Sequence, residues 1–157
     1  MSHTFVDQMM EKTRAGELRS PVSETLDMHL VEFARGEASY EMAARAELGN
    51  PLGVIQGGIA TVLADAAMAA ATTSILDDEE IMKSAITTID IFARFIRPVN
   101  AGKVSKLRAD AKVVRSGSRL VWAEAEVLAD GEVVGKFAST GIRVAFDPES
   151  YLKERGS

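Results

Sequence analysis

An alternation of apolar and polar residues in the second half of the chain predicts four consecutive β-strands, at 84–99, 104–115, 119–129 and 132–146. The apolar faces of the two middle strands are Leu107, Ala109, Ala111 and Val113, and Val121, Ala123, Ala125 and Val127. Short turns join the strands, and Asp130-Gly131 is the strongest hairpin signal because both positions favour positive φ. The pattern therefore predicts an antiparallel sheet with one buried face.

The first half of the chain combines a predicted hairpin with one long helix. Alternation at 23–33 and 38–46, around the turn sequence ARGEAS, predicts two more strands, and residues 4–14 have helical character. An alanine-rich helix begins at Gly57 and ends before the polar bend ILDDEEIMK. The residues expected to pack on the sheet are Ile59, Val62, Leu63, Ala66, Met68, Ala69 and Ala70. We expect an α+β fold, a curved six-stranded antiparallel sheet wrapped around one central helix.

Composition narrows the possible functions. A chain of 157 residues that is 46% hydrophobic is long enough for one domain with a core. The chain has no cysteine, which excludes disulfides and thiolate chemistry, and its two histidines, His3 and His29, are far apart, so no metal site is expected. A net charge of −5 without a basic cluster argues against nucleic acid as a partner.

The apolar run also raises the question of a membrane. Residues 57–76 are long enough to cross one, but Asp65 near the centre opposes insertion by ~2.5–3.5 kcal/mol. A helix buried within protein is the better interpretation, so no membrane partner is expected. The first residues lack a basic segment followed by an apolar one, which favours a cytoplasmic location.

Asp65 is the residue that calls for an explanation. A carboxylate in apolar surroundings costs several kcal/mol unless it is paired or hydrated, and its sequence neighbours offer no counter-charge. Such a group can activate water or attack a carbonyl directly. The structural alternative is a residue that faces a solvent-filled groove or pairs with a lysine or arginine.

Asn50 and three segments of the chain carry a family resemblance. The segments are GVIQGGIATVLAD (53–65), TTIDIFARFIRPV (87–99) and RSGSRLVWAEAEVLADGEVVGKFASTGIRV (115–144). Together they resemble the acyl-CoA thioesterases of the PaaI type, in the wider group that includes 4-hydroxybenzoyl-CoA thioesterases. The resemblance implies a hotdog fold for residues 21–146, between an N-terminal helical segment at 1–20 and a charged tail at 147–157. It implies hydrolysis of a small aromatic or medium-chain acyl-CoA, with coenzyme A as part of the substrate and no other cofactor.

The resemblance also implies roles for individual residues. Asp65 would be the nucleophile or general base, and the Gly57 amide at the helix start would polarise the carbonyl. Asn50 would bond the carbonyl or the water, and Thr88 would orient the nucleophile or water. The residues expected to bind substrate are Gln56, Gly58, Val54, Ile55, Arg115, Ser116, Gly117 and Arg119. Among them, Arg115 and Arg119 are expected to meet the phosphates of coenzyme A.

Further candidates complete this set. Arg97 and Lys103 are additional phosphate contacts, and the acyl tail is expected near Val54, Ile55 and either Phe92 or Phe95. The chain departs from the family at Gln56, which stands where a histidine is usual and cannot titrate near neutral pH.

Spacing along the helix predicts a site shared between subunits. Gly57 and Asp65 lie ~12 Å apart along one helix, whereas both must approach one reacting carbon. A two-fold arrangement in which Gly57 of one subunit faces Asp65 of the other would bring both groups to one carbon despite their separation along each helix. We therefore expect a homodimer, which pairs again into a tetramer.

Two alternative functions stay open. The first is a dehydratase or hydratase of this fold, which would need a histidine, but His29 is far in sequence from the glycine pair. The second is a non-catalytic acyl-CoA-binding protein, and the presence of Gln56 in place of the usual histidine supports it.

Overall fold

The computed structural model describes residues 7–8, 11–12, 15, 17 and 19–147. The predicted helix at 4–14 and the predicted tail at 147–157 therefore lie mostly outside the described residues. Among the residues that the structure describes, helices fall short of the length and hydropathy needed for a membrane crossing.

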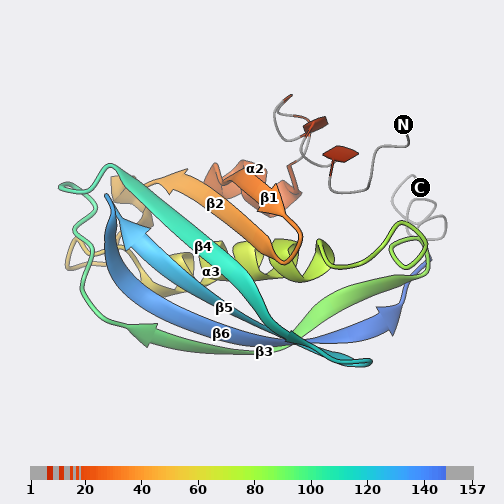
Figure 1. Cartoon of the computed structure of the whole chain (residues 1–157). Helices are drawn as coiled ribbons and strands as arrows, with labels where there is room; N and C mark the ends of the chain where they lie inside the picture. Colours follow the sequence, from red (N-terminus) through yellow and green to blue (C-terminus); the bar gives the residue numbers. More distant parts are fainter. Residues whose placement is uncertain (1–6, 9–10, 13–14, 16, 18, 148–157) are drawn as a thin grey trace.

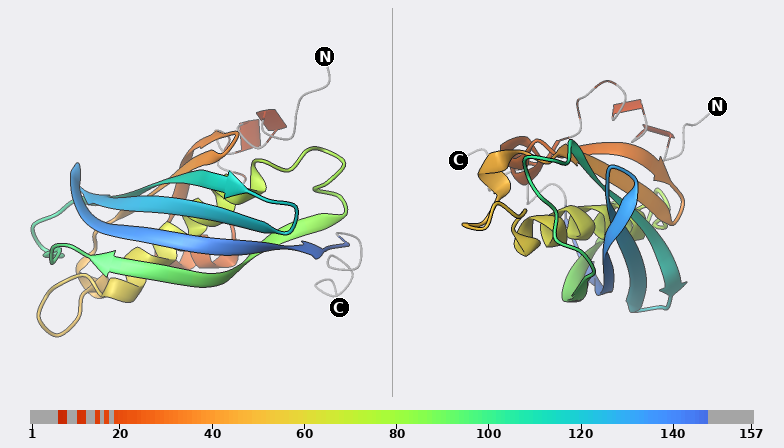
Figure 2. Two further views of the ribbon diagram at one scale, coloured as in Figure 1. Left: turned by 60° about the horizontal axis from the view of Figure 1, so that its bottom comes forward. Right: turned by 90° about the vertical axis from the view of Figure 1, so that its left-hand side faces the viewer.

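Six antiparallel strands form one sheet in the order β1-β2-β4-β5-β6-β3 (Figure 1). Their bounds are β1 His29–Ala34, β2 Glu37–Ala43, β3 Ser84–Phe95, β4 Lys106–Ser116, β5 Leu120–Ala129 and β6 Glu132–Ala145. The sheet curls around the single long helix α3, Gly57–Thr73, as the end-on view in Figure 2 shows. The hotdog fold predicted from the sequence is confirmed, and Asp130 and Gly131 adopt the expected positive φ of 46° and 90°.

The first predicted strand was wrong over its initial residues. Pro21–Leu26 forms a short helix, α2, and β1 begins only at His29. Ser20 caps this helix by accepting a hydrogen bond from the Ser23 amide, and Pro21 occupies the first helical position. These start signals outweigh the apolar alternation. The second predicted strand also ends early, at Ala43, and a 3-10 turn follows at Ala46–Leu48.

The buried face of α3 was only partly predicted. Leu63 and Met68 are buried as expected, whereas the half-buried residues include Ile59, Val62, Ala66, Ala69 and Ala70. The stripe that packs on the sheet also contains Ala64, Ala67 and Ala71, each with no exposed surface. Because the helix is apolar on nearly all sides, its periodicity does not reveal which face is buried.

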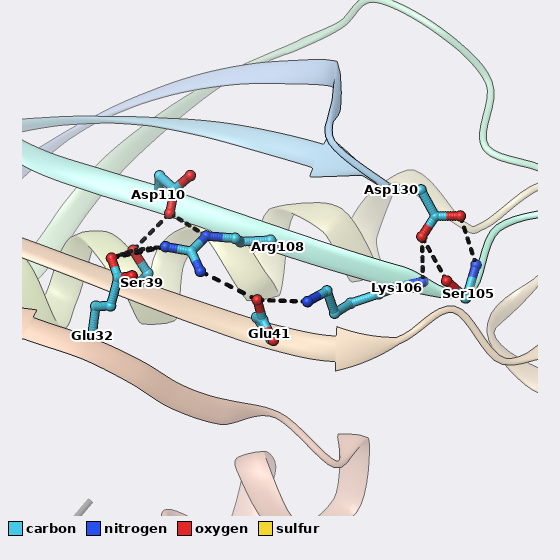
Figure 3. A network of polar contacts seen from close by, with 8 residues as sticks. All are labelled: Glu32, Ser39, Glu41, Ser105, Lys106, Arg108, Asp110 and Asp130. Carbon is cyan, nitrogen blue, oxygen red and sulfur yellow. Dashed lines mark hydrogen bonds and ion pairs between the residues drawn. The ribbon is translucent and has the colours of Figure 1, made fainter.

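The buried face of the sheet follows the predicted alternation. Leu107, Ala109, Val121 and Val127 have no exposed surface, and Leu107, Ala109 and Val127 belong to the same core cluster as the buried residues of α3. Their charged neighbours lie on the outer face of the sheet, where Arg108 forms ion pairs with Glu32, Glu41 and Asp110 (Figure 3). Although partial burial opposes it, hydrogen bonds to these carboxylates raise the pKa of Arg108. This network ties β1, β2 and β4 together on the side away from the helix.

A methyl group added at Gly141 tests the packing between β3 and β6. Its Cβ would lie 2.6 Å from Cγ2 of Ile86, a β-branched side chain with little freedom to move. We expect Gly141→Ala to lower the free energy of unfolding by about 1–3 kcal/mol in urea denaturation. Gly102→Ala is the control, because its Cβ meets no described atom within 4 Å, and it should change stability by less than about 0.5 kcal/mol.

Candidate active site

Asp65 and Thr88, 23 residues apart in sequence, meet between the helix and the sheet. Asp65 lies in the third turn of α3, and Thr88 Oγ1 on β3 donates a hydrogen bond to Asp65 Oδ1 at 3.1 Å. In the described part of the chain no lysine or arginine forms an ion pair with Asp65. The alternative in which Asp65 pairs with a cation is therefore not supported. The structure leaves a half-buried carboxylate held by one hydroxyl.

Asp65 opens onto a groove of about 310 Å³, here called the Asp65 groove, between α2, β1, β2 and α3. Ala66, Ala69 and Ala70 leave space along the helix. The other residues that line it are Ser20, Val22, Ser23, Met28, Leu30, Phe33, Tyr40, Val62 and Thr73. Burial raises the pKa of the Tyr40 hydroxyl above its usual value. The groove thus places one carboxylate in a mainly apolar slot.

A second groove, of about 420 Å³ and here called the Phe95 groove, lies at the start of α3. Asn50, Val54, Ile55 and Gly57 line it together with Phe95. Phe92 does not line it and instead lies on the outer face of the sheet, so of the two phenylalanines considered only Phe95 is near Val54 and Ile55.

Asn50 is held by the turn that precedes α3. Its side-chain carbonyl accepts hydrogen bonds from the amides of Leu52, at 2.9 Å, and Val54, at 3.2 Å. Such a turn fixes the backbone through an asparagine oxygen. Among the described residues nothing accepts a hydrogen bond from the Asn50 side-chain NH2, so this donor is available on the wall of the Phe95 groove.

The glycine pair at the start of α3 has two different environments. A Cβ at Gly57 would lie 3.0 Å from Phe95 Cζ, whereas one at Gly58 would meet no described atom within 4 Å. Gln56, the N-cap residue, is exposed and makes no side-chain capping bond. No acceptor for the Gly57 or Gly58 amide is found within the described residues, which is typical of the first turn of a helix. These amides are donors suited to a negative oxygen.

The predicted catalytic residues therefore fall into two groups within one chain. Asp65 and Thr88 meet beside the Asp65 groove, whereas Asn50 and Gly57 line the Phe95 groove. The two linings share no residue, as the eight-residue spacing along α3 leads one to expect.

The turn between β4 and β5 lies far from the helix start. β3 runs from Ser84, near this turn, to Phe95, which packs on Gly57 at the opposite end of the sheet. The residues of the turn also separate: Ser116 accepts a hydrogen bond from Arg143 at 3.2 Å, whereas the Arg115 guanidinium lies over the Trp122 ring. Gly117 and Arg119 complete the turn.

Two basic residues lie nearer the helix start in the same chain. Arg97 lines the Phe95 groove and forms an exposed ion pair with Glu132 at 3.3 Å. Lys103 is exposed in the loop before β4. Within one chain, Arg97 is thus better placed than Arg115 to meet a ligand at Gly57.

The sequence pattern did not predict that residues of α2 and Tyr40 line the Asp65 groove. The Ser20-Pro21 pair is a helix-start signal, and it was available in the sequence. Tyr40 was not identifiable, because its position beside Asp65 depends on how the hairpin folds over α3.

A third groove, of about 780 Å³, lies on the outer face of the sheet, away from Asp65. Several of its charged residues pair with one another, including Arg108 with Asp110 and Lys136 with Glu126. We therefore place the candidate site on the helix side of the sheet.

Comparisons with known proteins agree with this fold. The family model described as the thioesterase superfamily matches residues 52–136. A mutant of the phenylacetic acid degradation protein PaaI from Thermus thermophilus is 26% identical, with 80% of this chain and 100% of that chain covered and a TM-score of 0.71. A comparison with curated proteins gives no match.

Two more distant structures share the fold. The PaaI protein from E. coli is 22% identical, with 88% of this chain and 95% of that chain covered and a TM-score of 0.74. A thioesterase family protein from Silicibacter pomeroyi is 24% identical, with 87% and 98% covered and a TM-score of 0.73.

Two substitutions of Asn50 separate its role in the turn from its free donor. Asn50→Ala removes the acceptor for two amides, and we expect it to lower the free energy of unfolding by about 1–3 kcal/mol. Asn50→Asp keeps an acceptor oxygen for both amides and replaces the NH2 group with a second, negatively charged oxygen. Because the turn keeps its acceptor, the urea midpoint should stay close to that of the wild type. Equal destabilisation by both substitutions would contradict the turn described here.

Proposed function

The chain belongs to the thioesterase superfamily, and we propose that it hydrolyses the thioester of an acyl-CoA to a free acid and coenzyme A. The observation that carries this proposal is Asp65, a carboxylate without a cation partner in the described structure that is held by Thr88 beside an apolar groove. Thioester hydrolysis needs a base or nucleophile at this kind of position.

Asp65 has two possible roles in the chemistry. As a general base, its carboxylate takes a proton from water while the water oxygen attacks the thioester carbon. As a nucleophile, it forms a mixed anhydride that water then hydrolyses. In both routes the C–S bond breaks and the coenzyme A sulfur leaves with the bonding electron pair before it is protonated. Thr88 binds Oδ1 and so leaves Oδ2 for the reacting atom.

The carbonyl oxygen becomes negatively charged in either route. A fixed donor at that point stabilises the transition state by ~2.7–4 kcal/mol, and the Gly57 amide is our candidate for it. Gly57 also lets a substrate approach the backbone closely, although the Phe95 ring already packs against it. The side-chain NH2 group of Asn50 is a second donor on the same groove wall.

We further propose that the complete site forms between two copies of the chain. Two features support this: the two groups of residues lie in separate grooves, and β3 is an edge strand that pairs only with β6 among the described strands. Ile89, Phe92 and Phe95 on β3 are each more than half exposed. Pairing two β3 strands edge to edge would cover this surface and extend the sheet. Further pairing into a tetramer stays a prediction.

The acyl class proposed is a small aromatic or medium-chain group. Both grooves are lined largely by apolar side chains, so a thioester at their junction would direct its acyl group into one and its pantetheine arm into the other. Arg115 and Arg119 remain candidates for the phosphates of coenzyme A when supplied by the second copy, and Ser116 and Gly117 remain candidates for other substrate contacts there.

Asp65→Asn tests the proposed chemistry. It preserves shape but removes the base or nucleophile, so turnover should fall by about 10²–10⁴-fold while the circular dichroism spectrum is unchanged. The measurement is thiol release from a panel of aromatic and straight-chain acyl-CoAs. Glu124→Gln, an exposed carboxylate on the outer face, is the control and should keep full activity. Tight binding of acyl-CoA by the wild type without thiol release would instead support a non-catalytic binding protein.

Mixing two inactive variants tests whether the site is shared. Asp65→Asn removes the carboxylate, and Gly57→Val forces a side chain against Phe95 and blocks the helix start. In a mixed dimer with shared sites, one site carries both substitutions and the other carries neither. Unfolding and refolding the variants together should therefore restore about a quarter of wild-type activity. A mixture as inactive as its components would contradict sharing.

A further inference from the structure

A β-bulge in β3 decides where Thr88 points. Thr88 lies opposite Gly141 and Asp90 lies opposite Thr140, so one extra residue, Ile89, is inserted into β3. In a regular strand, residues two apart point to the same face. Here Thr88 reaches Asp65 on the helix side, whereas Asp90 precedes Phe92 and Arg94, which line the outer face. The bulge therefore reverses the alternation between Thr88 and Asp90.

Asp90 forms a hydrogen bond at this irregularity. Its Oδ1 accepts from the Thr140 amide at 3.1 Å, and among the described residues this is the only hydrogen bond of the Asp90 carboxylate. A bulge disrupts the regular ladder of backbone hydrogen bonds, and a backbone N–H without an acceptor is costly. The carboxylate thus supplies an acceptor where the pairing of β3 with β6 changes register.

Removing the bulge would change what Asp65 meets. If the segment 84–88 shifted by one residue to restore regular pairing, Ile89 would lie opposite Gly141 in the place of Thr88. Isoleucine cannot donate a hydrogen bond, so Asp65 would lose its partner. Gly141 has no side chain there, and a Cβ at this position would contact Ile86, so the backbone of the two strands fits closely on the helix side.

We propose that Asp90 is a positioning residue that acts through Thr88. By holding the bulge it sets the register of the first part of β3 and directs the Thr88 hydroxyl at Asp65. This inference rests on the proposed hydrolysis for its effect on rate, but not for its effect on the strand. Asp90 itself touches neither Asp65 nor the groove in front of it.

A double-mutant cycle between Asp90 and Thr88 tests the proposal. Asp90→Ala should lower kcat roughly 10- to 100-fold with KM little changed, as should Thr88→Ala, because both leave the carboxylate without its hydroxyl. In the Thr88→Ala background, Asp90→Ala should have no further effect. Asp90→Asn, whose side-chain oxygen still accepts a hydrogen bond, should keep most of the activity. Glu124→Ala is the control on the same face.

A second readout does not depend on activity. Amide hydrogen exchange at Thr140 and over residues 84–88 should be faster in Asp90→Ala and near the wild-type rate in Asp90→Asn. Unchanged exchange and kcat in Asp90→Ala would overturn the proposal. The proposal would also be overturned if Asp90→Ala lowered kcat equally in the wild-type and Thr88→Ala backgrounds. The same holds if its loss of kcat were accompanied by a changed oligomeric state. An inactive wild type in which Asp90→Ala still accelerates exchange would overturn the function but support the control of register.

Discussion

The hydrogen bond between Thr88 and Asp65 is the interaction on which the site depends. It places a carboxylate that has no cation partner in the described structure between an alanine-rich helix and the sheet. Such a group is stable only where hydrogen bonding or water meets its charge, so the residues around it cannot close on it completely. The small side chains of Ala66, Ala69 and Ala70 keep that space open. The groove follows from the same requirement.

The sequence was enough to predict the sheet and the central helix, because alternation and turn chemistry act locally. The Asp130-Gly131 turn and the buried faces of β4 and β5 are examples. Local patterns were insufficient elsewhere. The face of α3 that packs inward depends on the surrounding strands, and the bulge beside Thr88 depends on a partner strand 50 residues away.

The candidate site illustrates the same limit. Asp65 stood out because its charge conflicts with its neighbours, and the family resemblance brought in Thr88, Asn50 and Gly57. The structure adds how they group: one pair meets across helix and strand, and the other lies around the glycine turn. Distance along α3 keeps the two groups apart in a single copy, as the eight-residue spacing between Gly57 and Asp65 predicts.

The short helix α2 gives the fold a separable part. It has six residues, lies outside the sheet, and is held by a cap at Ser20 and by Arg19, which bonds Asp27 just after its end. Yet Val22 and Ser23 form one wall of the Asp65 groove. Substitutions at these few positions would change the shape of the groove without changing the pairing of any two strands. If the proposed hydrolysis takes place in this groove, substitutions in α2 would change which substrates fit while leaving Asp65 and Thr88 in place.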